Sequence, residues 1–157
     1  MKQTAYITAS QVLDLLASRH HKDVFVRECK GGPTWGGGSP RLDGWAMRKS
    51  WTHPCMWGYE VKVSRSDWLR DQKIAAYLPL CNVLYVVAPS GIVQPEELPD
   101  SVGLLVVNIT VCNNNAAIGR RFFYQLADVR KAILYRTRGE TDVVFHLYIK
   151  INPYQLK

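Results

Sequence analysis

The chain has 157 residues, 47% of them hydrophobic, and its 20 lysines and arginines exceed its 13 acidic residues, which gives a formal net charge of +7. This length predicts one domain over residues 1–157 with a core of its own. No apolar run is long enough to cross a bilayer, and the first residues lack the apolar stretch of a signal peptide. We therefore expect a cytoplasmic protein with no membrane partner. The excess of positive charge favours a polyanionic partner such as nucleic acid.

The four cysteines, Cys29, Cys55, Cys81 and Cys112, are scattered along the chain and form no Cys-x-x-Cys pair. Zinc sites and iron–sulfur clusters usually include at least one such close pair, so we predict neither. The cysteines are interpreted as buried thiols in a reducing compartment.

The first predicted element is a helix over Ala9–Arg19. Thr8 and Gln11 have the spacing of a capping box, and apolar residues recur at helical intervals behind them. A strand over Val24–Cys29 follows, because its residues alternate in character. The next segment, Gly31–Pro40, is rich in glycine and proline and is predicted to be a loop. It lacks the Gly-Lys-Ser/Thr ending of a phosphate-binding loop, so it either turns the chain or grips a substrate.

The central pattern is a pair of strands predicted over Leu42–Met47 and Trp57–Val63. In the second strand, aromatic and aliphatic residues occupy alternate positions and point to one face, whereas Glu60 and Lys62 point to the other. We expect this second face to be left open by the fold or filled by a ligand. Asp43 lies in the first strand, and a chain reversal between the strands would bring it beside Glu60.

Further along, Ser64 is predicted to cap a helix that continues to Tyr77 and is stopped by proline. Apolar strands are predicted over Asn82–Ala88, covered on both faces, and over Leu104–Val107. The remaining predictions are a loop after Cys112, a helix over Phe122–Arg136 with a basic face, and an end segment, Val143–Ile151, that fits a strand or a helix. This order predicts an α/β (α+β) fold in which helices flank a central mixed β-sheet.

Two carboxylates and a lysine at one spot, Asp43, Glu60 and Lys62, form an arrangement that can hold Mg²⁺ or Mn²⁺ and activate water against a phosphodiester. The alternative is structural. A Glu60–Lys62 surface salt bridge would contribute about 0–1 kcal/mol, and Asp43 would then be a turn residue.

Asp43 followed by Glu60-Val-Lys on the next strand resembles the PD-(D/E)XK nuclease superfamily, whose core has the same order of helix and strands. More specifically, the stretch Arg41–Leu105 is similar to the MmcB-like DNA-repair family. The matching segments are Arg41-Leu-Asp-Gly-Trp-Ala, Glu60-Val-Lys-Val-Ser-Arg-Ser-Asp-Trp, Asp71-Gln-Lys, Tyr77-Leu-Pro-Leu-Cys-Asn and Leu84-Tyr-Val-Val-Ala-Pro. The resemblance implies a restriction-endonuclease-like fold.

The resemblance also implies roles for individual residues. Asp43 and Glu60 would bind the metal together with the Val61 backbone carbonyl, and Lys62 would orient the attacking water or neutralise charge on the phosphate. Many members add a glutamate from the first helix. This helix offers only an outward-facing aspartate, so Glu28 on the neighbouring strand is the substitute candidate.

The predicted partner is DNA. Lys73, Arg48 and Lys49 are candidate phosphate contacts, and Trp35 and Trp51, in predicted loops, could stack on bases. We expect a metal-dependent DNA endonuclease or exonuclease acting in repair, recombination or defence. The alternative is a non-catalytic basic module on the same fold that binds nucleic acid or a protein.

Overall fold

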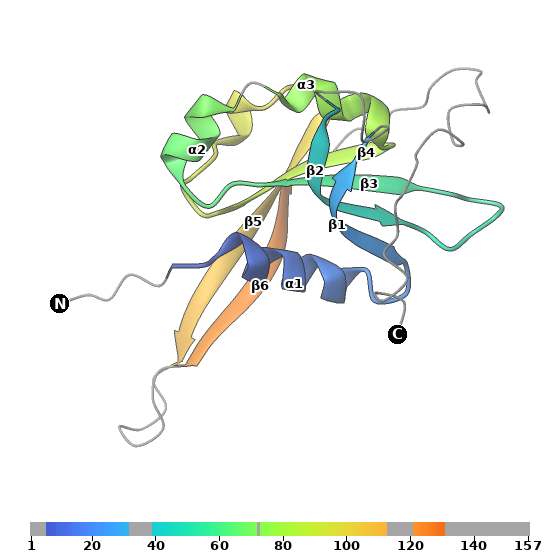
Figure 1. The fold of residues 1–157 in the computed structure, drawn as a ribbon. Helices are drawn as coiled ribbons and strands as arrows, with labels where there is room; N and C mark the ends of the chain where they lie inside the picture. The colour runs from blue at the N-terminus through green and yellow to red at the C-terminus, as the bar shows by residue number, and fades with distance from the viewer. Residues whose placement is uncertain (1–5, 32–38, 72, 113–120, 131–157) are drawn as a thin grey trace.

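A six-stranded sheet with the strand order β1-β2-β3-β4-β5-β6 forms the centre of the molecule. The computed structural model describes residues 6–31, 39–71, 73–112 and 121–130 (Figure 1). The β3–β4 and β4–β5 pairs are parallel and the other pairs are antiparallel, so the sheet is mixed. The strands are β1 (Val24–Lys30), β2 (Arg41–Met47), β3 (Met56–Val61), β4 (Val83–Pro89), β5 (Val102–Cys112) and β6 (Arg121–Arg130).

Helices cover both faces of this sheet (Figure 1). Helix α1 (Ala9–Arg19) packs on one face, where its Val12 and Leu16 share a core with Tyr59. The other face is covered by α2 (Arg65–Arg70), α3 (Ile74–Tyr77) and the 3₁₀ turn η1 (Leu78–Leu80). A second 3₁₀ turn, η2 (Pro95–Glu97), lies between β4 and β5. The predicted central mixed sheet flanked by helices is confirmed, and no helix in the described part of the chain is long and apolar enough to cross a membrane.

The first helix has the predicted bounds because both halves of its capping box form. The Thr8 hydroxyl accepts from the Gln11 backbone N–H at 3.3 Å, and the Gln11 side chain accepts from the Thr8 N–H at 2.9 Å. Strand β4 is also as predicted, since its residues from Val83 to Ala88 are all buried between the two helical layers.

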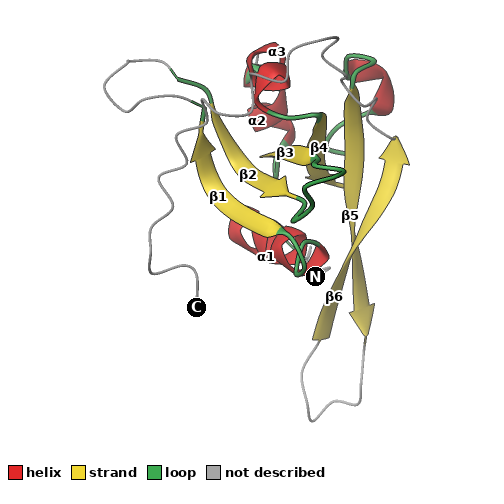
Figure 2. Cartoon of the chain, turned by 90° about the vertical axis from the view of Figure 1, so that its right-hand side faces the viewer, coloured by secondary structure: helices red, strands yellow, loops and turns green. Residues whose placement is uncertain are grey.

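The predicted helix over Phe122–Arg136 is wrong where the structure describes it. Residues 121–130 form β6, which pairs with β5 from Cys112↔Arg121 to Leu104↔Arg130. The helix was predicted from the helical spacing of a few apolar residues. The edge of β5 offers backbone hydrogen-bond partners to this segment, and the local sequence pattern does not reveal such partners. Figure 2 shows β5 and β6 extending together beyond the rest of the sheet. Four predictions lie wholly or mostly outside the described residues: the loop Gly31–Pro40 with Trp35, the loop after Cys112, the second half of that predicted helix, and Val143–Ile151.

The single helix predicted from Ser64 to Tyr77 is two short helices. The Ser64 cap is present and accepts from the Asp67 backbone N–H at 3.2 Å. Helix α2 ends at Arg70, and Asp71 is extended, with φ −84° and ψ 118°. The Asp71 side chain accepts from the Lys73 backbone N–H at 2.8 Å, a local bond that competes with helix continuation.

Gly58 lets the chain after η1 approach β3. A Cβ placed on Gly58 would lie 2.8 Å from Cys81 Sγ and 3.1 Å from the methyl groups of Leu42 and Leu84. We expect Gly58→Ala to lower the free energy of unfolding by about 1–3 kcal/mol through overpacking. Urea unfolding of a double-mutant cycle measures this, and the loss should shrink in a Cys81→Ala background. Equal losses in both backgrounds would contradict the close approach.

Candidate active site

The antiparallel register of β2 and β3 positions the first two candidate residues. Trp45 pairs with Gly58, and continuing this register by two residues brings Asp43 opposite Glu60 on the same face of the sheet. Asp43 Oδ2 accepts a hydrogen bond of 2.8 Å from the Val61 backbone N–H. The structure therefore brings the Asp43 and Glu60 carboxylates together at the end of the strand pair.

Glu60 and Lys62 are buried, each with 5% of its surface exposed. The expectation that their face would be open is therefore wrong. Trp68 of α2 and Tyr77 of α3 belong to the core on this face, so the two short helices cover the strand that carries the charged pair. Charged groups withdrawn from water in this way need specific partners.

The Lys62 ammonium has carboxylates from two different elements around it. Its Nζ lies 2.9 Å from Glu60 Oε1 and 2.6 Å from Asp71 Oδ2, with Asp67 Oδ2 at 3.8 Å. The Glu60 contact was anticipated from the spacing on one strand. The contacts to Asp71 and Asp67 were not predicted, because they join residues of different elements that no local pattern relates. The available signal was the segment Asp71-Gln-Lys, which places a carboxylate soon after the Glu60–Lys62 strand.

These contacts determine the charge states of the cluster. Burial alone would lower the pKa of Lys62, but the hydrogen bonds to Asp71 and Glu60 outweigh it, so the pKa is raised and the lysine stays charged. Burial likewise opposes ionisation of Asp71, but the bonds from Lys62 and from the Lys73 backbone hold its pKa below the usual value. Lys62 and Asp71 thus form a stable buried ion pair.

Glu60 is different, because only one of its two oxygens has a partner. Oε1 accepts from Lys62, whereas Oε2 is fully buried and has no hydrogen-bond partner among the described residues. Burial, followed by the negative charge of Asp43, raises the pKa of Glu60 to about 7 despite the bond to Lys62. Burial also raises the pKa of Asp43, against the bond from Val61 and the Lys62 charge. An unpartnered buried oxygen beside a second carboxylate is a position that a cation would stabilise.

The donor set suits a hard cation that keeps most of its water. Within the described ranges, no three His, Cys, Asp or Glu side chains group so as to hold a metal ion. Mg²⁺, however, is commonly bound by only one or two carboxylates, with waters and substrate phosphate completing the shell. Asp43 and Glu60 can supply these two carboxylates. The Val61 N–H holds Asp43 in place, and the Val61 carbonyl stays a predicted ligand.

The other candidate residues are not part of this cluster. Glu28 is exposed, and its Oε2 lies 3.8 Å from Arg41 Nη1, so the structure does not join it to Glu60. Glu28 has a positive φ of 51°, which interrupts its pairing opposite Asp43. Lys73 is exposed at the start of α3.

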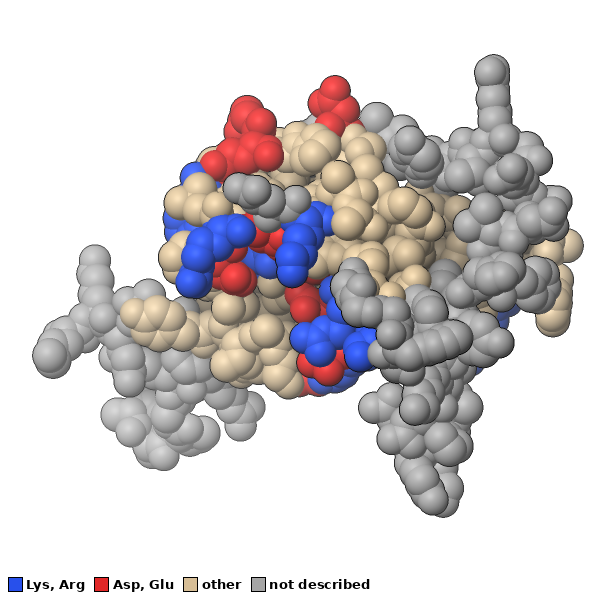
Figure 3. All heavy atoms as spheres, turned by 45° about the horizontal axis from the view of Figure 1, so that its top comes forward, with Lys and Arg blue, Asp and Glu red and all other residues tan. Residues whose placement is uncertain are grey.

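The candidate contacts Arg48 and Lys49 lie beyond the far end of β2 and β3, in the exposed connection between the two strands. The Arg48 guanidinium carbon lies 5.3 Å from the centroid of the half-buried Trp57 ring, and Trp51 is fully exposed. Figure 3 shows lysine and arginine atoms beside acidic atoms on one face of the molecule. Arg48 and Lys49 lie at the opposite end of the strand pair from the Glu60–Lys62 cluster.

Tyr77 is a further residue of the cluster that sequence reasoning did not assign. It is 5% exposed, and burial together with the charges of Glu60 and Asp71 raises its pKa to about 12. Its hydroxyl stays protonated at neutral pH and can act as a hydrogen-bond donor beside the carboxylates. Its signal in the sequence was the Tyr-x-x-x-Cys spacing to Cys81, whose thiol donates to the Tyr77 carbonyl at 3.6 Å.

No protein-family model and no curated protein sequence matches the chain. Among solved structures, the chain is similar to a protein of unknown function from Silicibacter pomeroyi. The two are 25% identical, with a TM-score of 0.53, over 83% of this chain and 75% of that one. This similarity supports the arrangement of sheet and helices and carries no information on activity.

The Glu60 pKa gives a test of the site without metal. The pKa of Glu60 is about 7 in the folded state, whereas an ordinary glutamate has a pKa near 4.5. Between these pH values the folded state binds more protons than the unfolded state, so the contribution of Glu60 to stability falls as pH rises through this window. In chelator, Glu60→Gln should gain stability relative to wild type from pH 5 to pH 8, by on the order of 2–3 kcal/mol. Urea unfolding at each pH measures the difference.

The matched control is Glu96→Gln, which removes an exposed carboxylate from η2. The difference in free energy of unfolding between wild type and Glu60→Gln should change with pH. A constant difference from pH 5 to pH 8 would show that Glu60 is not a buried carboxylate without a partner.

Proposed function

We propose that the chain is a Mg²⁺- or Mn²⁺-dependent deoxyribonuclease of the PD-(D/E)XK kind, hydrolysing phosphodiester bonds in repair, recombination or defence. One observation carries the proposal. The Oε2 atom of Glu60 is buried without a hydrogen-bond partner among the described residues. It lies at the end of the β2–β3 pair that also holds the Asp43 carboxylate and the charged Lys62. A fold selected only for stability would place a hydrogen-bond donor at that oxygen.

The topology supports the restriction-endonuclease-like fold that the sequence resemblance implies. Helix α1 is followed by the antiparallel strands β1, β2 and β3, then by a helical crossover to the parallel strand β4. In that core the aspartate comes from the second strand, and the glutamate and lysine from the third. In this chain Asp43 lies in β2, Glu60 lies in β3 and Lys62 directly follows β3.

In the proposed reaction, Asp43 and Glu60 would hold the cation, with the Val61 carbonyl as the backbone ligand. When bound, the cation would lower the pKa of a water molecule. Lys62 would stabilise the negative charge that develops on the phosphate. Asp71 now lies 2.6 Å from the lysine, so a phosphate oxygen and the Asp71 carboxylate would compete for the same ammonium. Lys73, Arg48 and Lys49 would contact the flanking phosphates.

A second function is favoured by a different observation. Lys62 is already neutralised by two buried carboxylates, Glu60 and Asp71, and no three-ligand metal group is present among the described residues. These features fit a non-catalytic basic module, in which the cluster serves stability and the charge of +7 serves binding. The two functions differ in their response to metal.

Metal binding should stabilise the folded protein. If Mn²⁺ or Mg²⁺ binds at Asp43 and Glu60, a hundredfold excess over the dissociation constant should raise the free energy of unfolding by about 2.7 kcal/mol. The measurements are thermal unfolding and calorimetric titration of wild type and of Asp43→Asn combined with Glu60→Gln. The double variant should lose both the stabilisation and the binding heat. Equal metal binding by the two proteins would place the cation elsewhere.

Cleavage should depend on the same residues. We expect timed digestion of duplex, single-stranded and branched DNA to require Mg²⁺ or Mn²⁺, and Lys62→Met and Glu60→Gln each to reduce the rate about a hundredfold or more. Both variants should retain DNA binding, because one phosphate contact among several contributes little to affinity. Lys22→Met, at an exposed position with no assigned role, is the charge-matched control.

Circular dichroism establishes that each variant is folded before its rate is compared. Wild-type protein that binds these DNAs and cleaves none of them would favour the binding module. Cleavage that persists in both variants would show that the reaction uses other residues.

A further inference from the structure

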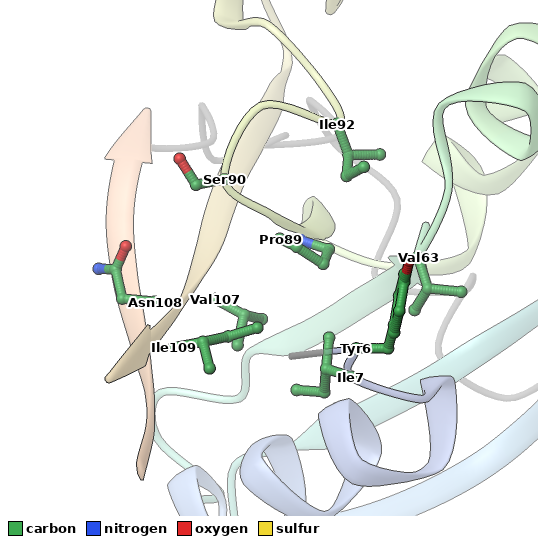
Figure 4. Close-up of a pocket in the computed structure, with 9 residues that line it drawn as sticks. All are labelled: Tyr6, Ile7, Val63, Pro89, Ser90, Ile92, Val107, Asn108 and Ile109. Atoms are coloured by element: carbon green, nitrogen blue, oxygen red, sulfur yellow. The ribbon is translucent and has the colours of Figure 1, made fainter. Parts of the chain in front are cut away.

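A pocket of about 440 Å³ opens at the end of β3 and β4 (Figure 4). Its walls come from four parts of the chain: the residues before α1, the residue Val63 beyond β3, the turn after β4 and the middle of β5. Ile7 and Val107, which line it, belong to the core on the α1 face of the sheet. Carboxyl ends of parallel strands are a frequent location for ligand sites in sheets of this kind.

The lining combines an aromatic ring with aliphatic walls. Tyr6 is 83% exposed although it is a large aromatic residue, and it lies at the rim of the pocket (Figure 4). Aliphatic side chains, among them Ile7, Ile92 and Val107, form the walls. The side chains of Ser90 and Asn108 point away from the cavity (Figure 4). An exposed aromatic ring over an apolar floor suits stacking with a flat ring system such as a nucleobase.

The position of the pocket relates it to the candidate active site. Val63 directly follows Lys62, so their Cα atoms are about 3.8 Å apart. Successive residues of an extended chain point to opposite faces, and Lys62 is buried under α2 and α3 whereas Val63 is exposed in the pocket wall. A strand of nucleic acid that has a phosphate at Lys62 therefore reaches this pocket by passing around the end of β3.

We propose that this pocket binds the base of an unpaired nucleotide in the strand whose phosphate reaches Asp43, Glu60 and Lys62. The inference rests on the proposed function for the course of that strand. A base inside a continuous duplex is stacked and paired, and it can enter a protein pocket only after leaving the helix. The substrate class is therefore DNA with unpaired nucleotides, such as single strands, flaps and frayed ends.

The test measures binding in chelator, so that no cleavage interferes. A fluorescent thymidine oligomer with one 5-bromouracil and its fully paired duplex are titrated with wild type, Tyr6→Ala and Tyr6→Phe. Loss of one stacked base should weaken single-strand binding about 5- to 100-fold in Tyr6→Ala. Tyr6→Phe retains the ring and should bind like wild type, and duplex affinity should be the same in all three proteins.

Irradiation of the bromouracil complex gives a second, independent readout. The cross-link should map by mass spectrometry to the peptide that contains Tyr6 and should be lost in Tyr6→Ala. Asn108→Ala is the matched control, because its exposed side chain points away from the cavity, and it should leave the affinity and the cross-link unchanged. Unchanged single-strand affinity in Tyr6→Ala, or cross-links only at other peptides, would overturn the proposal.

The outcomes also separate this inference from the nuclease. Cross-linking at Tyr6 in a protein that cleaves no DNA would support the pocket and reject the enzyme. Metal-dependent cleavage that proceeds equally on duplex and single strand and is unaffected by Tyr6→Ala would support the enzyme and reject the pocket.

Discussion

The buried ammonium of Lys62 is the constraint on which the arrangement of this domain depends. A charge that is 5% exposed is tolerated only if partners surround it, and here Glu60 and Asp71 do so at 2.9 and 2.6 Å. Asp71 reaches the lysine because helix α2 stops at Arg70 and the chain turns before α3. The break between α2 and α3 therefore brings a second carboxylate to the buried lysine, in addition to the one on its own strand.

Hydrogen bonding in the same cluster is incomplete at one carboxylate. Each oxygen of Asp71 has a partner, but Glu60 keeps one buried oxygen without one, beside the Asp43 carboxylate. Native proteins usually satisfy such atoms, and exceptions concentrate at sites that bind something. The surrounding core, which includes Trp45, Trp68 and Tyr77, holds the carboxylates close despite their repulsion. The energetic cost of this arrangement is the physical basis of the proposed cation site.

Strand β3 separates two environments with opposite properties. On one face, Glu60 and Lys62 lie among charges under short helices. On the other, Tyr59 and Val61 pack against α1, and Val63 continues into the pocket at the strand end. Tyr59 also donates to or accepts from buried His20, with 2.6 Å between the hydroxyl and Nε2. A ligand that engages both faces has to bend around the end of this strand, which a single nucleic-acid strand can do more readily than a duplex.

The sequence by itself determined the elements whose signals are local. Three features depend only on neighbouring residues: the capping box at Thr8, the alternation around Glu60 and the apolar run of β4. The same alternation predicts that Asp43 lies beside Glu60 once the two strands pair. The tertiary structure alone decided that residues 121–130 form a strand, that Lys62 is buried, and that Asp71 is its partner. These features depend on backbone and charge partners that other elements of the fold supply. The alternation of apolar and polar residues shows which face of a strand a residue occupies, but it does not show what covers that face.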